Sequence, residues 1–237
     1  MSGRGLPELA AEQRRILVVN AKGGCGKTTL TTYLAAVYAA MEVDTALVDH
    51  DPQGSASQWL KARPESRPAI QGIAPWKHTG DGSTTRSFQM RLAFQAQRVV
   101  IDTPAALSAS DFGRWLDEAD RIVIPVLPSA IDIKAGARFI GDLLLDRHYR
   151  NRRIPLAVVA NRVRRNTLVF HKLERFLVSL RIPFVATFRD LQDYVRAAES
   201  GDGLFELARG GDATEWASFT QLIHWIEAPA SPPRGAG

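Results

Sequence analysis

Short apolar runs recur along the chain, and longer segments of mixed polarity separate them. The runs are rich in Val and Ile and show little alternation with polar residues. This is the pattern of parallel strands that are covered by helices on both faces of a sheet. The strands predicted from it lie at residues 15–19, 45–49, 98–102, 121–126 and 155–160, with a weaker sixth at 183–187.

The segments between these runs predict amphipathic helices. After the first run, Leu30, Leu34 and Val37 fall on one face of a helix. Comparable helical patterns lie at 131–147, 167–180 and 214–228. Because strands alternate with helices, we expect an α/β fold with a doubly wound, mostly parallel sheet.

The two ends of the chain depart from this pattern. The last ten residues, APASPPRGAG, are rich in Ala, Pro and Gly. We expect a single domain at 15–228, between a flexible N-terminal extension at 1–14 and a flexible tail at 229–237.

The composition narrows the functional class. The hydrophobic share of 45% and the charged share of 23% are typical of a soluble globular protein. No apolar run approaches the ~18–20 residues of a membrane-spanning helix, and the first residues lack the apolar region of a secretory signal. Cys25 is the only cysteine, which excludes an intrachain disulfide and a paired-cysteine iron–sulfur site. We therefore expect a cytoplasmic protein.

The positive charge is concentrated in one part of the sequence. Residues 147–181 hold ten Arg or Lys and a single acid, Glu174, a local charge of +9 in a chain of net charge +5. Such clustering predicts one face that binds a polyanion.

The stretch NAKGGCGKTT, residues 20–29, lies between the first predicted strand and the first predicted helix. Its glycines, Gly23, Gly24 and Gly26, allow backbone N–H groups to turn inward around a phosphate without clashes from Cβ atoms. The N-terminus of the following helix adds its free N–H groups and its positive dipole end. A strand, a glycine-rich turn and a helix in this order predict a phosphate-binding loop.

The side chains of this loop have separate expected roles. Lys27 is expected to contact the β- and γ-phosphates, and the Thr28 hydroxyl to ligate Mg²⁺. Thr29 is expected to donate to the α-phosphate. Cys25 is expected to touch phosphate through its backbone only. A thiol at a helix N-terminus is expected to be somewhat acidic, and ATP is expected to protect it from alkylation.

A second lysine separates this loop from the general pattern GxxxxGK[ST], which has Gly where this chain has Ala21. With Lys22 next, the loop resembles that of the deviant Walker A ATPases of the ParA/MinD family, which reads xKGGxGK[ST]T. The resemblance implies a deviant P-loop NTPase domain that uses ATP and Mg²⁺. It also implies that Lys22 is a signature lysine, which reaches the phosphates of the partner's ATP in a homodimer with ATP sandwiched between the subunits.

Three aspartates follow the second and third predicted strands, in VDHDPQG (48–54) and VVIDTPA (99–105). Asp102 ends a hydrophobic strand, where a carboxylate can hold Mg²⁺, through a coordinated water. The two segments resemble the family motifs VDxDPQGxA and IDTPP, with Ala105 in place of the second proline. The resemblance implies that Asp51 positions the attacking water and that Asp49 lies in the second shell of the metal.

Two more segments carry the resemblance, which runs from about residue 15 to about residue 226. Asn161, after the fifth predicted strand, matches the family asparagine that reads the adenine edge. The segment VLPSAIDIKA (126–135) resembles PxxPSxxDxxA. With few residues before the first strand, the chain resembles the short ParA type of partition and positioning ATPases.

Other branches of the family have sequence features that can be checked in this chain. A MinD-like membrane-cycling ATPase ends in a basic amphipathic helix, but TEWASFTQLIHWIEA (214–228) has no Lys or Arg, so we expect it to pack on the core. A metabolic enzyme of this fold, such as a dethiobiotin synthetase-like ligase, needs a second polar cluster for its substrate, and none is evident. Tyrosine kinases of this fold have a tyrosine-rich tail, which is absent here.

The favoured interpretation is a ParA-like ATPase that dimerises on ATP, binds nonspecific double-stranded DNA of the nucleoid and positions a cargo. The resemblance implies a ParB-like or other adaptor that stimulates hydrolysis, and no membrane partner is expected. The cargo stays open among a plasmid, a chromosome region, a chemosensory array and a carboxysome. The candidate DNA contacts, which would bind phosphates without reading sequence, are Arg164, Arg165, Lys172 and Arg175.

Overall fold

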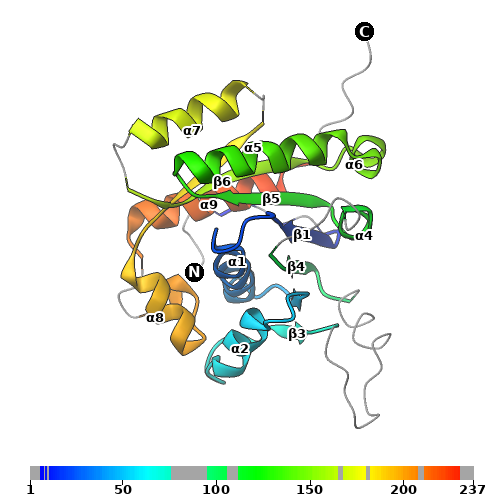
Figure 1. Ribbon diagram of the computed structural model, residues 1–237. Coiled ribbons are helices and arrows are strands. Elements are labelled where there is room, and N and C mark those ends of the chain that lie inside the picture. The colour runs from blue at the N-terminus through cyan, green and yellow to red at the C-terminus, as the bar shows by residue number, and fades with distance from the viewer. Residues whose placement is uncertain are drawn as a thin grey trace.

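A parallel sheet of seven strands forms the centre of the molecule (Figure 1). The computed structural model describes residues 6–7, 9, 11–75, 95–105, 112–164, 168–179, 182–207 and 211–229. The strand order is β3-β2-β4-β1-β5-β6-β7, and each pairing is parallel. The strands are β1 (Arg14–Val18), β2 (Thr45–Asp49), β3 (Gln71–Ile73), β4 (Arg98–Asp102), β5 (Arg121–Val126), β6 (Leu156–Val163) and β7 (Phe184–Arg189).

The apolar runs predicted six of these strands, and their positions are confirmed to within two residues except at the end of β6. Strand β3 was missed. Only Ile73 of its three residues is buried, and the segment is a strand because it pairs with Ala46–Val48 at the edge of the sheet. A short edge strand of this kind leaves no hydrophobic pattern in the sequence.

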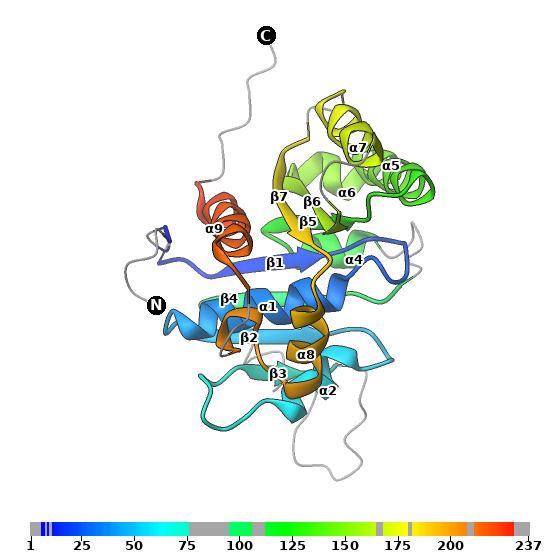
Figure 2. The same ribbon diagram turned by 90° about the vertical axis from the view of Figure 1, so that its left-hand side faces the viewer.

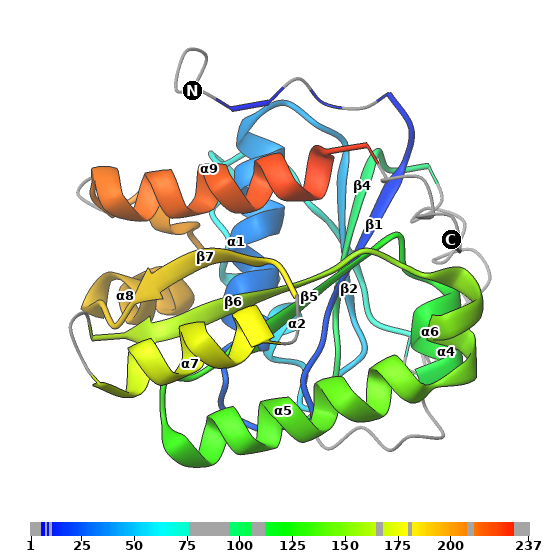
Figure 3. The same ribbon diagram turned by 90° about the horizontal axis from the view of Figure 1, so that it is seen from above.

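Helices cover both faces of the sheet (Figures 2 and 3). One face carries α1 (Lys27–Ala40), α2 (Ser55–Ala62), α8 (Gln192–Ser200) and α9 (Ala213–Glu227), with the short 3₁₀ turn η2 (Leu204–Glu206). The other carries α4 (Phe112–Asp117), α5 (Ala130–Leu145), α6 (Arg147–Arg152) and α7 (Leu168–Ser179). Each face has its own apolar core, so the expected doubly wound α/β fold is confirmed, whereas α2, α4, α6 and α8 were not predicted.

The C-terminal helix α9 is part of the core. Phe219, Leu222, Ile223 and Ile226 are buried against α1 and the sheet. Within the described residues, no helix is long and apolar enough to cross a membrane. Near the other terminus, Leu6 and Leu9 are half-buried against the same core, and the expected flexibility of 1–14 stays a prediction.

Arginines at the starts of three central strands hold the end of α9. Arg98, at the start of β4, is fully buried and donates from Nε and Nη2 to the two Glu227 oxygens, at 2.9 and 2.7 Å. The Tyr38 hydroxyl donates to Glu227 Oε1 at 2.7 Å. Arg14 and Arg121 donate to the last carbonyls of the helix. This network fixes the last turn of α9 to the sheet.

Loss of the Glu227 charge is expected to destabilise the fold. Burial raises the pKa of Glu227, but Arg98 and Tyr38 outweigh it and hold the pKa below its ordinary value. Glu227→Gln leaves the Arg98 guanidinium buried without its counter-charge, at an expected cost of about 3 kcal/mol. Urea denaturation at pH 7 measures it, with exposed Glu65→Gln as the control. An equal effect of both substitutions would contradict the assignment.

Candidate functional site

The motif residues meet at the carboxyl edge of the central strands. Strand β1 lies between β4 and β5, and β4 lies between β2 and β1. In this register Val18 is level with Asp102, and Asp102 is level with Asp49. The loops after β1, β2 and β4 therefore leave the sheet side by side, as expected at the ligand edge of an open α/β sheet.

Two glycines give the phosphate loop its shape. Gly24 has φ +75° and Gly26 has φ +91°, a left-handed conformation that residues with a side chain rarely adopt. A Cβ atom on Gly26 would also lie 1.9 Å from Asn161 Nδ2. Helix α1 begins directly after Gly26, so its first N–H groups face the loop.

Asn161, at the end of β6, contacts the loop directly. Its Nδ2 donates to the Cys25 carbonyl at 2.9 Å, and its Oδ1 accepts from the Arg162 backbone N–H at 3.0 Å. The sequence led us to expect a residue that reads adenine, and that role stays a prediction. The structure adds a second role, because this side chain joins the loop to β6.

The metal-site residues Thr28 and Asp102 are in contact. Thr28 Oγ1 donates to Asp102 Oδ2 at 2.7 Å, and Thr31 Oγ1 to Asp102 Oδ1 at 3.3 Å. Asp102 is fully buried, and its pKa is raised to about 7, chiefly by burial. The charges of Asp49 and Asp51 contribute to this rise, while the Thr28 hydroxyl and the Lys27 ammonium oppose it. A cation at this carboxylate would remove much of the cost of its ionisation.

These donors fit Mg²⁺, which prefers oxygen ligands and usually binds through one or two protein groups together with substrate phosphates. Within the described ranges there is no group of three His, Cys, Asp or Glu side chains that could hold a metal alone. The Thr28 hydroxyl and the Asp102 carboxylate would hold the ion, with the remaining positions left for phosphate oxygens and water.

Asp49 stabilises the turn that carries Asp51. Its carboxylate accepts from the Asp51 backbone N–H at 3.1 Å, and from the backbone N–H and Oγ of Ser57 at 2.8 and 2.6 Å. Asp51 in turn accepts from the backbone N–H of Gln53 at 3.0 Å. Asp49 is buried and engaged by its own turn, whereas Asp51 is half-buried and lines the adjacent cavity.

The two lysines of the loop point to different places. Lys27 is buried, and its Nζ lies 3.3 Å from the Lys22 carbonyl, within the loop. Lys22 Nζ instead contacts Asp132 Oδ1 on α5 at 2.9 Å. Ser129, the N-cap of α5, hydrogen bonds to Asp132 Oδ2. Burial raises the pKa of Asp132, but Ser129 and Lys22 outweigh it and leave it lowered. The sequence indicated that the phosphate loop and residues 126–135 are important, but it did not predict this ion pair between them.

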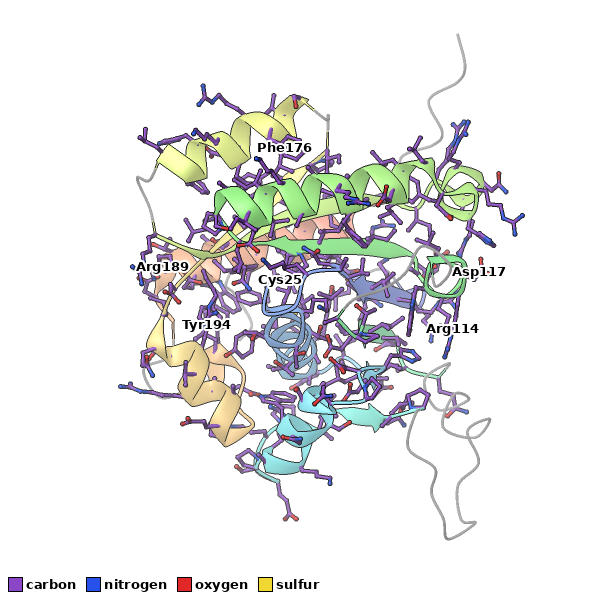
Figure 4. The ribbon with its side chains drawn as sticks, viewed as in Figure 1. Cys25, Arg114, Asp117, Phe176, Arg189 and Tyr194 are labelled. Carbon is purple, nitrogen blue, oxygen red and sulfur yellow. The ribbon has the colours of Figure 1, made fainter. Side chains whose placement is uncertain are left out.

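The expectation of an acidic Cys25 thiol is wrong. The residue is 1% exposed, and its Sγ faces the Lys22 carbonyl at 3.2 Å inside the loop (Figure 4). Burial raises the pKa of the thiol by more than the nearby Lys27 lowers it. Because the loop itself buries the thiol, alkylation is a poor test of ATP binding.

A cavity of about 570 Å³ opens beside the loop. Its floor includes Lys27, Thr28, Thr29 and Asp51. Its far wall comes from the end of β7 and from α8, where Figure 4 shows Arg189 and Tyr194 on the same side of the molecule. Sequence reasoning missed this wall, because α8 is a largely polar helix without a motif. Its dimensions suit a nucleotide.

Gly23 differs from the other two glycines of the loop. Gly24 and Gly26 line the cavity, whereas Gly23 does not. The φ of Gly23 lies outside the left-handed region, and a Cβ atom there would meet the Ala105 Cβ at 3.7 Å, an ordinary van der Waals contact. Among the three glycines, the left-handed conformation is therefore found only at Gly24 and Gly26. Binding of phosphate by the Gly23 backbone N–H stays a prediction.

The basic segment does not form a single face. Arg147 and Arg150 lie on α6, before β6 begins, whereas Arg162 and Arg164 lie at the carboxyl end of β6. A strand of eight residues separates the two groups by about 26 Å. Figure 3 shows α6 at one end of α5 and α7 beside its other half. The expectation of one polyanion-binding face is therefore corrected to two basic groups at opposite edges of the sheet.

The candidate DNA contacts also differ from one another. Arg164 is exposed but contacts Asp190 at 3.4 Å. Lys172 and Arg175 are exposed on the outer side of α7, and neither forms an ion pair with any of the residues described. Arg165 lies outside the described residues.

Comparison with known proteins agrees with this geometry. The model of the CobQ/CobB/MinD/ParA nucleotide binding domain matches residues 16–205. Maintenance of carboxysome distribution protein A from Halothiobacillus neapolitanus is 29% identical over 213 residues, which are 89% of this chain and 95% of that protein. Protein ParA from Rhizobium radiobacter is 27% identical over 146 residues, 61% of this chain and 62% of that protein.

A solved structure shows the same fold. The ATP complex of a McdA variant from Cyanothece superposes with a TM-score of 0.65 and 14% identity, over 92% of this chain and 97% of that one. The family model covers most of the chain and includes the phosphate loop, both aspartate segments and Asn161. The chain belongs to the CobQ/CobB/MinD/ParA nucleotide-binding domain family.

Proposed function

We propose that this protein is a ParA-like ATPase that dimerises around ATP, binds nonspecific DNA in that state and positions a cargo through a partner. The observation that carries the proposal is the different placement of Lys27 and Lys22. Lys27 lies inside a loop whose neighbours Thr28 and Asp102 are in contact, whereas Lys22 is held outside it by Asp132. In this position Lys22 does not contribute to the phosphate site of its own subunit, but it could contribute to the phosphate site of a second subunit.

The proposed reaction is hydrolysis of ATP to ADP and phosphate. Backbone N–H groups of residues 23–29 and the Lys27 ammonium bind the triphosphate. Mg²⁺, held by Thr28 and Asp102, would neutralise phosphate charge, with Asp49 behind it. Asp51 orients a water molecule for attack on the γ-phosphorus, and Asn161 binds the adenine.

Lys22 completes this site across the dimer. After it leaves Asp132, its ammonium stabilises the negative charge that develops on the phosphoryl oxygens of the ATP bound by the partner subunit. The ion pair with Asp132 is the resting state of the monomer. Transfer of Lys22 from Asp132 to phosphate therefore couples hydrolysis to dimerisation.

The proposed cargo is a carboxysome. This proposal is supported by the relative named for carboxysome distribution, because the match covers 95% of that protein. The match to the ParA relative covers 62% of that protein. An adaptor on the cargo would stimulate hydrolysis and release the dimer from DNA. The protein would then act in the cytoplasm, on the nucleoid. A membrane-cycling role has less support, because α9 is packed on the core and its last residue, Glu227, is hydrogen-bonded to Arg98.

The test is the affinity for random duplex DNA, measured with ATP, with ADP and without nucleotide at two salt concentrations. Binding that requires ATP and weakens steeply with salt would support the proposal. Binding to anionic liposomes with ATP, and to DNA in no state, would contradict it.

The two basic groups predict a difference between matched variants. Lys172→Ala/Arg175→Ala removes two exposed cations of α7 from each subunit, and we expect the DNA affinity of the dimer to fall and its salt slope to decrease by up to about 4. Arg147→Ala/Arg150→Ala removes the same charge at the other edge of the sheet and is expected to have less effect. Equal losses would show that only net charge matters. The salt dependence of fluorescence anisotropy measures both.

A further inference from the structure

His50 lies between the two aspartates of the VDHDP segment, and its side chain contacts α4. Its backbone N–H donates to the Asp102 carbonyl at 3.0 Å, which continues the β2–β4 ladder. Its side chain is 4% exposed, and the imidazole packs against the Trp115 ring of α4. The ring centroids are 4.4 Å apart at an interplanar angle of 76°.

Two buried polar atoms in this contact form no hydrogen bond with the described residues, although one of them lies within ion-pair distance of a carboxylate. Within the described residues, neither His50 Nε2 nor Trp115 Nε1 has a hydrogen-bond partner. Glu118 Oε2 lies 3.7 Å from His50 Nε2, slightly beyond hydrogen-bond length. Buried polar atoms are nearly always paired in native proteins, because an unpaired one loses its hydration without compensation. A purely packing role would be filled at lower cost by an apolar side chain.

The contact joins the two loops that carry the candidate catalytic groups. His50 is part of the turn that holds Asp51, and α4 follows Asp102 along the chain. The Arg114 guanidinium carbon lies 5.1 Å from the centroid of the Trp115 ring, so the indole contacts both a guanidinium and the imidazole. Figure 4 labels Arg114 and Asp117 on this helix, on the opposite side of the phosphate loop from Tyr194. A displacement of the turn that carries Asp51 would therefore move the His50 imidazole against α4.

We propose that His50 is a positioning residue for Asp51, and that its imidazole closes onto Glu118 when the turn engages nucleotide. Closure gives Nε2 a carboxylate partner and fixes the turn at the distance from the phosphates that Asp51 requires. The inference rests on the proposed function, because it takes Asp51 to orient the attacking water. It adds that the contact between His50 and α4 changes when nucleotide binds.

Trp115 emission tests the closure separately from hydrolysis. The difference between the spectra of the wild-type protein and Trp115→Phe isolates its signal, and a nonhydrolysable ATP analogue supplies the occupied state. We expect this signal to change on binding and the change to be lost in His50→Ala. Trp59→Phe is the control, because that indole is already bonded to the Asp202 carbonyl. An unchanged Trp115 signal in a protein that binds the analogue would overturn the proposal.

Kinetics test the positioning role. In His50→Ala and Glu118→Gln we expect kcat to fall by about tenfold or more, with ATP affinity within about threefold of wild type. His50→Gln, which keeps a side-chain N–H donor, is expected to restore part of kcat. Loss of ATP affinity with kcat intact, or full activity of His50→Ala, would overturn the proposal. Failure of the wild-type protein to hydrolyse ATP would contradict the proposed function instead, and the emission test would still apply.

Discussion

Lys22→Ala is expected to bind ATP as a monomer almost as well as the wild-type protein and to hydrolyse it at least about 10³-fold more slowly. The reason is the geometry of the loop. Lys22 lies outside the cavity, with its Nζ on Asp132, whereas Lys27 lies within the loop. Its removal is therefore expected to cost the ground-state complex little, and under the proposed function it removes a cation that acts only when phosphoryl transfer develops charge. Isothermal titration and a phosphate-release assay measure the two quantities.

The control is Lys134→Ala, which removes an exposed lysine from the same helix as Asp132 and is expected to leave both quantities unchanged. A mixing experiment decides whether Lys22 acts across the dimer. In a heterodimer of Lys22→Ala and Asp51→Ala, one of the two sites has its own Asp51 and receives Lys22 from the other subunit. An equal mixture of the two inactive proteins should then regain about a quarter of wild-type activity. If the mixture stays inactive, Lys22 does not act in trans.

Asp102→Asn is expected to weaken Mg²⁺-dependent ATP binding by at least about tenfold and yet to stabilise the protein without nucleotide at pH 8. The pKa of Asp102 is raised from 3.8 to about 7, chiefly by burial. Between these values the native state keeps a proton that the unfolded state has released, so the free energy of unfolding decreases as pH rises. The upper limit of this loss at pH 8 is about 4 kcal/mol, and we expect Asn to recover about 1–3 kcal/mol.

Thermal unfolding in EDTA from pH 4 to pH 8.5 measures this effect. The stability gain of Asp102→Asn should grow from about pH 4, where the unfolded carboxyl begins to ionise, and should level off above pH 7, where the native carboxyl ionises as well. Asp44→Asn, an exposed carboxylate, is the control and should show no such growth. With Mg²⁺ and ATP added at pH 8, the wild-type protein should become more stable than Asp102→Asn, because only the wild-type side chain is then a carboxylate that can pair with the cation. A variant that is less stable than wild type at every pH would contradict the assignment.

Much of the candidate site could be predicted because its residues lie within short segments. Asp49 and Asp102 end strands that their apolar runs made recognisable, and the phosphate loop and Asp51 follow such strands. Parallel strands place their carboxyl ends at one edge, so the fold class alone predicts that these segments meet. The contact between Thr28 and Asp102 is an instance, since 74 residues separate the two in the chain.

Contacts that depend on tertiary packing could not be predicted. No local pattern indicates that Asn161 closes on Gly26, that α8 forms a cavity wall or that His50 lies on Trp115. Cys25 shows why local rules fail. Its place beside a helix N-terminus suggests an acidic thiol, but complete burial raises its pKa. Burial is a property of the surrounding elements and not of the loop sequence.

The α/β class, six of the seven strands described and the position of the phosphate loop are readable in the sequence alone, because hydrophobic periodicity and glycine conformation act over a few neighbouring residues. The relative positions of the charges depend on the tertiary fold. It pairs Lys22 with Asp132 and divides one basic segment between two edges of the sheet. This happens because a strand carries the chain from one edge to the other, so residues close in sequence become distant and residues far apart in sequence come into contact.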